Sequence, residues 1–116
     1  MRYFIFGSNC DVSYTRVEEI LDKYIKKDDE IITVVREGVN EYVAEYAARH
    51  NIKYKVYEDA APKVGQAVQY QFAKFYASSS DRCLFIFSQI EPPELNYAYK
   101  AALEVKIIDD ILYDFV

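Results

Sequence analysis

Three apolar runs constrain the fold of this chain more than any other feature: RYFIF at 2–6, IITVV at 31–35 and CLFIF at 83–87. After Arg2 none of them contains a charged residue. A strand is apolar throughout when both of its faces are buried, as in a parallel sheet that helices cover on two sides. The runs therefore predict the central strands of such a sheet.

Amphipathic segments separate the predicted strands. Apolar residues recur at three- and four-residue spacing over about 13–27 and from Val39 to His50, which is the period of a helix with one buried face. His50 is expected to cap the second helix. A third helix to about residue 77 has an expected core stripe, and a fourth helix follows. The stripe consists of Val64, Val68, Phe72 and Phe75, and the fourth helix carries Leu95, Ala98, Tyr99, Ala102 and Leu103.

Two further segments complete the predicted sheet. KYKVY at 53–57 alternates in polarity and predicts a strand near an edge, and VKII at 105–108 predicts the last strand. The tail DDILYDFV is expected to form a short helix or strand. Strands that alternate with helices predict a three-layer Rossmann-like α/β fold, a parallel sheet of about five strands with helices on both faces. Right-handed crossovers give the order 3-2-1-4-5.

Composition limits the classes of function. The 116 residues suit one domain, 1–116. A formal net charge of −5 argues against nucleic-acid binding, which needs a basic surface. Cys10 and Cys83 are expected to be free thiols, and no Cys or His spacing indicates a metal site. The apolar start MRYFIFG is too short for a signal peptide or a membrane span. We therefore expect a cytoplasmic protein without metal or cofactor.

Each of the glycines lies at a junction between predicted elements. Gly7 and Gly38 directly follow buried strands, and Gly65 opens a helix. Glycine permits a positive φ and close backbone approach, so it either forms a tight turn or admits a ligand. Neither GxGxxG nor a P-loop is present, which excludes the standard dinucleotide and nucleoside triphosphate sites. In a sheet of this order, ligands bind beyond the carboxyl ends of the strands, where the winding reverses.

Four segments resemble the SLOG superfamily, which includes DprA-type proteins and LOG-type phosphoribohydrolases. They are FGSNCD, VVREGVNEYVAEYAARHNI, KVYEDAAPKVGQAV and SSDRCLFIF, and the resemblance runs over about residues 3–108. The small YspA-like group is the most similar in the order and spacing of these segments. The resemblance implies a Rossmann-like domain that binds a nucleotide-derived molecule.

The chain departs from that pattern where phosphate would bind. Glu37-Gly38-Val39 replaces a Gly-Gly-Ala turn, Asn40 stands at the position of an Asp, and QIEPPE replaces a glycine-rich loop. Proline has no N–H to offer a phosphate. The carboxylates of Glu37, Glu91 and Glu94 would repel one. We therefore expect a neutral or cationic ligand rather than a phosphate-rich nucleotide.

Three functions remain open. The first is binding of a small nucleoside-like or nucleotide-derived ligand without strong catalysis, at a site formed by Gly7, Ser8, Asn9, Glu37, Gly38, Asn40, Ser88 and Gln89. The second, implied by the resemblance, is N-glycosidic cleavage or transfer with Glu94 as the catalytic carboxylate. Glu94 also fits a structural role in the first turn of a helix, where the dipole favours a negative charge. The third is a degenerate scaffold that acts through protein contacts.

The aromatic content indicates a contact surface. The chain has 12 Tyr and 7 Phe, and Tyr70 and Tyr76 fall outside the expected core stripe of the third helix. Tyrosine is favoured at protein interfaces because it buries a large area with little loss of entropy. We expect a homodimer that pairs through this helix.

Overall fold

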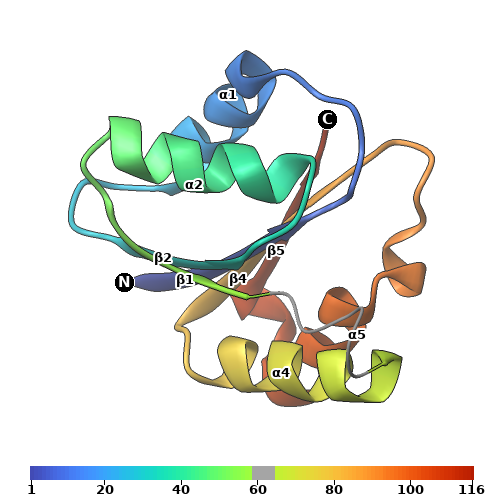
Figure 1. Cartoon of the computed structure of the whole chain (residues 1–116). Helices are drawn as coiled ribbons and strands as arrows, with labels where there is room; N and C mark the ends of the chain where they lie inside the picture. Colours follow the sequence, from blue (N-terminus) through green and yellow to red (C-terminus); the bar gives the residue numbers. More distant parts are fainter. Residues whose placement is uncertain (59–64) are drawn as a thin grey trace.

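Five parallel strands form the central sheet of the protein, seen here in a computed structural model that describes residues 1–58 and 65–116 (Figure 1). Their order is β3-β2-β1-β4-β5. The bounds are β1 Arg2–Gly7, β2 Glu30–Val34, β3 Lys53–Tyr57, β4 Arg82–Phe87 and β5 Ile111–Phe115. The predicted fold class and strand order are confirmed.

Helices cover both faces of the sheet. On one face lie α1 (Tyr14–Tyr24) and α2 (Val39–Arg49), and on the other lie α4 (Gln66–Ser78) and α5 (Tyr97–Val105) (Figure 1). Short 3-10 turns, η1 at Pro93–Leu95 and η2 at Ile108–Asp110, flank α5. The winding direction thus reverses between β1 and β4. Within residues 1–58 and 65–116, every helix is too short or too polar to cross a lipid bilayer.

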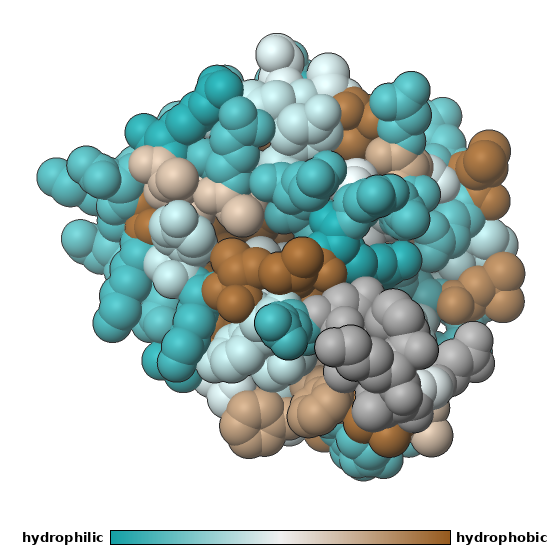
Figure 2. Space-filling model, viewed as in Figure 1, coloured by the Kyte–Doolittle hydropathy of each residue, from teal (hydrophilic) through white to brown (hydrophobic). Residues whose placement is uncertain are grey.

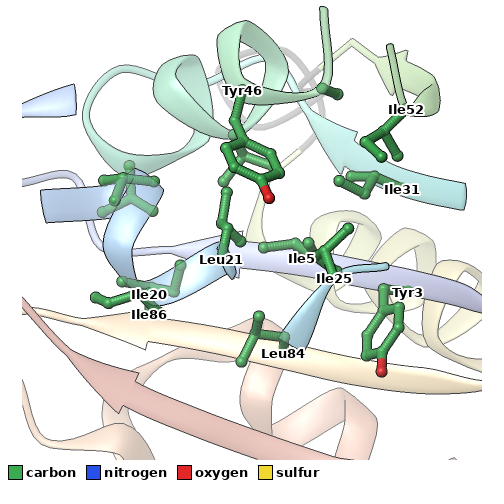
Figure 3. Packing of buried hydrophobic residues seen from close by; sticks show 14 residues of the cluster. Tyr3, Ile5, Ile20, Leu21, Ile25, Ile31, Tyr46, Ile52, Leu84 and Ile86 are labelled. Carbon is green, nitrogen blue, oxygen red and sulfur yellow. The ribbon is translucent and has the colours of Figure 1, made fainter. Parts of the chain in front are cut away.

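The two sides of the sheet have different cores. Alternate residues of β1 point to opposite sides, so Tyr3 and Ile5 pack under α1 and α2 while Phe4 and Phe6 pack under α4 and α5. The first core is mostly aliphatic and includes Ile20, Leu21, Ile31, Leu84 and Ile86 (Figure 3). On the second side the strands supply phenylalanine rings, and the helices mainly supply alanine: Ala73, Ala77, Ala98, Ala101 and Ala102.

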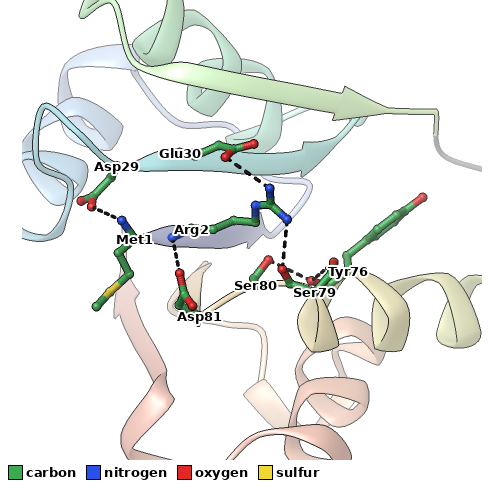
Figure 4. A network of polar contacts seen from close by, with 8 residues as sticks. All are labelled: Met1, Arg2, Asp29, Glu30, Tyr76, Ser79, Ser80 and Asp81. Carbon is green, nitrogen blue, oxygen red and sulfur yellow. Dashed lines mark hydrogen bonds and ion pairs between the residues drawn. The ribbon is translucent and has the colours of Figure 1, made fainter.

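Arg2 ties the amino ends of the strands together (Figure 4). Its backbone N–H donates to the Asp81 carboxylate at 2.7 Å. Its guanidinium donates to the Ser79 carbonyl at 3.3 Å and pairs with Glu30 at 3.4 Å. These contacts join β1 to β2 and to the loop before β4. The amino edge of the sheet is therefore held together by ion pairs and hydrogen bonds.

The prediction of the last strand at 105–108 is wrong. Val105 ends α5, and Ile108 begins a 3-10 turn. The edge strand is Ile111–Phe115, in which Ile111 pairs with Cys83 of β4. The first residue of VKII belongs to α5, and the residues that follow connect this helix to the amino edge of the sheet. The predicted tail therefore supplies the strand.

The predicted core stripe of α4 is also wrong. Val68, Phe72 and Phe75 are 37%, 44% and 63% exposed, whereas Tyr76, expected on the surface, is only 8% exposed. Val64 lies outside the described residues. The period is helical, but the sheet already presents large rings on this side, so α4 turns small residues toward it. Ala73 and Ala77 are buried with Tyr76.

This orientation predicts opposite effects for two neighbouring aromatic residues. Tyr76 packs on Phe4, with ring centroids 5.8 Å apart, so Tyr76→Ala should lower the free energy of unfolding by about 3–5 kcal/mol. Phe75→Ala removes an exposed ring and should change that free energy by less than about 0.5 kcal/mol. Urea denaturation followed by circular dichroism measures both. A larger loss in Phe75→Ala than in Tyr76→Ala would contradict the observed orientation of α4.

Candidate functional site

Ser8 joins the carboxyl ends of β1 and β4, where the winding reverses. Its N–H donates to the Ile86 carbonyl at 2.9 Å, and its Oγ accepts from the N–H of Ser88 at 3.0 Å. The side chain of Ser8 is almost fully buried. These bonds continue the pairing of the two strands past their ends. Ser8 thus has a structural role at the predicted site.

Asn40 performs a similar function between β1 and β2. Its Oδ1 accepts from the N–H of Gly7 at 2.8 Å, and its Nδ2 donates to the carbonyl of Val34 at 3.0 Å. The side chain is 1% exposed. Because a buried amide is stable only when its hydrogen bonds are made, these two contacts fix the first turn of α2 against both strand ends.

The glycines at this junction allow the backbone to approach itself. A Cβ on Gly38 would lie 2.8 Å from the backbone nitrogen of Cys10 and 2.9 Å from the carbonyl oxygen of Ser8. A Cβ on Gly7 would lie 2.3 Å from a methyl carbon of Val39. The N–H of Val39, at the start of α2, donates to the Ser8 carbonyl at 3.3 Å. The space that a phosphate would occupy at this helix terminus is thus filled by the chain itself.

An open acidic crevice of about 310 Å³ lies beside this junction. Two predicted residues with exposed side chains, Asn9 and Glu37, line it. The other lining residues are Cys10, Asp11, Val12, Gly38, Glu41 and Tyr42. Gln89, also predicted, is exposed in the turn after β4.

The chemistry of this crevice does not favour nucleophilic catalysis. Burial, followed by the negative charges of Glu91 and Asp11, raises the pKa of the Cys10 thiol. The thiol therefore stays protonated at neutral pH, and only the thiolate is a good nucleophile. Across residues 1–58 and 65–116, no group of three His, Cys, Asp or Glu side chains could hold a metal ion.

Glu94 lies in the 3-10 turn η1 and is exposed. It makes no hydrogen bond or ion pair with the residues that the structure describes. The N-terminus of α5 is capped instead by Asn96, whose Oδ1 accepts from the N–H groups of Ala98 and Tyr99 at 3.0 and 3.1 Å. The catalytic role of Glu94 stays a prediction.

His50 caps the carboxyl end of α2, as expected. Its Nε2 lies 2.8 Å from Oε2 of Glu18, and its ring stacks on Tyr46 with centroids 4.1 Å apart. The hydrogen bond from His50, followed by that from Tyr14, lowers the pKa of Glu18. His50 therefore links α2 to α1 and lies in neither hollow at the carboxyl ends of the strands.

A second hollow, which we call the aromatic hollow, opens on the other side of the sheet at the carboxyl ends of β1, β2 and β3. Its free interior is about 10 Å³, against about 310 Å³ for the acidic crevice. Five rings line it, together with one carboxylate and one carboxamide. The lining residues are Phe4, Phe6, Val34, Glu58, Gln69, Phe72, Ala73, Tyr76 and Tyr97.

Arg36 lies next to the aromatic hollow and was not predicted as a site residue. It follows β2 by two residues, and its guanidinium carbon lies 4.7 Å from the centroid of the Phe6 ring. Phe6 in turn packs edge-to-face on Tyr97, with centroids 5.3 Å apart. Arg36 could have been identified from the sequence, because it is a cation that follows the second strand at the edge where ligands bind in this fold.

Comparisons with protein-family models, with curated proteins and with solved structures found no match. The resemblance to the SLOG superfamily therefore stays a hypothesis. The function has to be inferred from the geometry of the two hollows.

The closed junction gives a prediction about two glycines that both have positive φ, +87° at Gly38 and +81° at Gly65. An alanine at either position is strained, by about 1–3 kcal/mol. At Gly65 the new methyl group meets no described atom within 4 Å, whereas at Gly38 it collides with backbone. Gly38→Ala should therefore lose a further ~1–3 kcal/mol of unfolding free energy. Equal losses in the two variants, measured by urea denaturation, would show that the junction is looser than the structure indicates.

Proposed function

We propose that the protein binds a small nucleoside-like molecule at the carboxyl ends of its strands, with the ring of the ligand in the aromatic hollow. The observation that supports this proposal is the lining of the hollow. Five aromatic rings surround the polar groups of Glu58 and Gln69 at the edge of the sheet where ligands bind in this fold.

The lining suits a nucleobase in particular. Aromatic side chains stack on planar rings, and such stacking contributes about 1–3 kcal/mol per base. The carboxylate of Glu58 accepts hydrogen bonds from the amino group of a base, and a carboxamide such as that of Gln69 both donates and accepts. The free interior of about 10 Å³ leaves no room for a second base, so the proposal is limited to a single base rather than a dinucleotide.

Entry of the ring requires a side chain to move. The free interior of the hollow is about 10 Å³, enough for one water molecule. Phe72 lines the hollow but is 44% exposed, so it is the lining ring least held by the core. We propose that Phe72 turns outward when the ligand binds, which widens the hollow without disturbing the sheet.

Binding without strong catalysis follows from the acid and base groups that are present. Cleavage of a glycosidic bond generally uses a pair of carboxyl groups on either side of it. Among the residues described as lining the aromatic hollow, Glu58 is the one carboxylate. Glu94 is not among them. The N-glycosidic activity that the resemblance implies therefore remains an alternative, and the experiment below detects it.

The proposal predicts selective binding of nucleosides. We expect adenosine, guanosine or cytidine, which carry amino groups, to bind more tightly than uridine in isothermal titration calorimetry. Glu58→Gln should weaken that binding by about ten- to a hundredfold, because a hydrogen bond to a charged group contributes about 1.5–3 kcal/mol. Glu94→Gln is the matched control and should bind normally.

Two outcomes would contradict this proposal. If none of the four nucleosides binds, the scaffold function is favoured instead. If free base appears during incubation and disappears in Glu94→Gln, the protein is an N-glycosidic enzyme.

We also propose that the protein forms a homodimer through α4. Val68, Phe72 and Phe75 form an exposed apolar stripe on this helix, and Figure 2 shows hydrophobic surface at the lower edge of the molecule, where α4 lies. Two copies with a net charge of −5 repel each other over most of their surface. An uncharged stripe that meets its own copy around a two-fold axis avoids that repulsion.

The residues proposed for this interface differ from those predicted. Tyr76 is buried in the core, and the phenol of Tyr70 hydrogen-bonds to Glu104 of α5. Neither is a free aromatic anchor. A standard interface covers ~800 Å² on each partner, more than one stripe provides. The adjacent edge strand β3, whose residues from Lys53 to Val56 are exposed, would supply the remainder.

Dimer formation is tested by placing a charge in the stripe. Phe75→Glu should convert the dimer to a monomer at micromolar concentration, since two buried carboxylates would face each other across the two-fold axis. Ile90→Glu is the control, because Ile90 is 93% exposed in the loop after β4, away from α4. Multi-angle light scattering measures the mass. A wild-type mass equal to one 13.6 kDa chain at every concentration would rule the dimer out.

A further inference from the structure

Arg36 differs from every other arginine of the chain, all of which the structure describes, because it pairs with no carboxylate among the described residues. The other four each form an ion pair: Arg2 with Glu30, Arg16 with Glu19, Arg49 with Glu45 and Arg82 with Asp110. The chain has 19 acidic residues against 14 lysines and arginines, so carboxylates are in excess. An unpaired arginine is therefore unexpected here.

One nitrogen of Arg36 is also buried without a hydrogen-bond acceptor. Its Nη1 is shielded from solvent and has no partner among the residues that the structure describes. Within that part of the chain it is the one buried side-chain nitrogen or oxygen in this condition. A buried donor that makes no hydrogen bond destabilises the protein, and more so when the group is charged. An oxygen atom from outside the chain would remove this penalty.

Phe6 fixes the position of the Arg36 guanidinium. The guanidinium lies over the Phe6 ring, which packs against Tyr97, and both rings also line the aromatic hollow. The N–H groups of a guanidinium form a planar fork, which matches the oxygens of a carboxylate or a phosphate.

The acidic crevice of this edge and the ring that Arg36 contacts lie on opposite sides of the sheet. The crevice that contains Asp11, Glu37 and Glu41 is beside α2, whereas Phe6 belongs to the core under α4 and α5. The aromatic hollow has its own carboxylate, Glu58. A ligand in the hollow therefore meets a negative group just after β3, and Arg36 lies against Phe6, one of the lining rings.

We propose that Arg36 binds a single anionic group, a phosphate or a carboxylate, on the nucleoside-like ligand, while Glu58 binds the amino edge of its base. This inference rests on the proposed function, and it changes the expected ligand from a neutral nucleoside to a nucleoside monoanion or monophosphate. A polyphosphate chain is not part of it, because the hollow is small and the neighbouring crevice is acidic.

The test compares each nucleoside with its 5′-monophosphate and its 5′-carboxylic acid by isothermal titration calorimetry. For the wild-type protein we expect at least one of the two anions to bind about tenfold more tightly than the neutral nucleoside, as a charge-assisted bidentate contact provides. The anion that shows the gain identifies the group that Arg36 binds.

Variants at Arg36 assign the effect. Arg36→Met should abolish the gain from the anion and leave the affinity for the neutral nucleoside within about threefold of wild type. Arg82→Met is the matched control: it removes the same charge at the amino end of β4 and should keep the gain. Arg36→Lys, which keeps the charge but lacks the planar fork, should retain part of it. Thermal unfolding of each variant checks that it is folded.

The outcomes separate this inference from the proposed function. Equal affinities of the neutral and anionic ligands for wild type would overturn the role of Arg36 and leave nucleoside binding intact. A gain that persists in Arg36→Met would overturn it as well, and would show that Arg36 only packs on Phe6. If neither nucleosides nor their anions bind, both proposals fail. If Arg36→Met does not fold, a reduced gain in Arg36→Lys supports the inference, and an unchanged gain overturns it.

Discussion

The buried amide of Asn40 is the contact on which the architecture of the binding edge depends. By accepting from Gly7 and donating to Val34, it joins the ends of β1 and β2 to the first turn of α2. This is possible only because the backbone can approach closely at Gly7 and Gly38. The N–H of Val39, the first of α2, then donates to the chain itself, and the crevice that remains beside α2 is lined by Asp11, Glu37 and Glu41. This side of the edge therefore offers no favourable position for a phosphate.

The cores on the two sides of the sheet are built differently. Phenylalanines from the strands and alanines from the helices fill the α4 and α5 side, whereas the α1 and α2 side is packed with branched aliphatic residues. Tyr76 illustrates the arrangement, since it contacts the rings of Phe4, Tyr57, Phe72 and Phe75. The aromatic hollow forms where this group of rings reaches the edge of the sheet.

The strands and their order could be predicted well, because the features that determine them are local in the sequence. Runs such as RYFIF and CLFIF are apolar on both faces, and the handedness of crossovers then determines the strand order. The face of α4 that packs on the sheet could not be predicted, because a helical period does not show which side chains fit against the sheet. The glycines showed where backbone approaches closely, but not whether a ligand or the chain fills the space. Ser8 and Asn40 were predicted as binding residues at the carboxyl edge of the sheet, and their hydrogen bonds are internal.

The charge distribution explains why one cation matters in so acidic a protein. At long range an anionic ligand is repelled by the net charge of −5, and this repulsion is screened within about 10 Å at moderate salt. At short range the attraction of Arg36 is strengthened, because the Phe6 ring against it excludes water on that side and lowers the local dielectric. The repulsion acts on every anion, whereas the proposed attraction requires a ring that enters the hollow. Binding as proposed would therefore favour ring-bearing ligands with one anionic group over both free phosphate and polyphosphates.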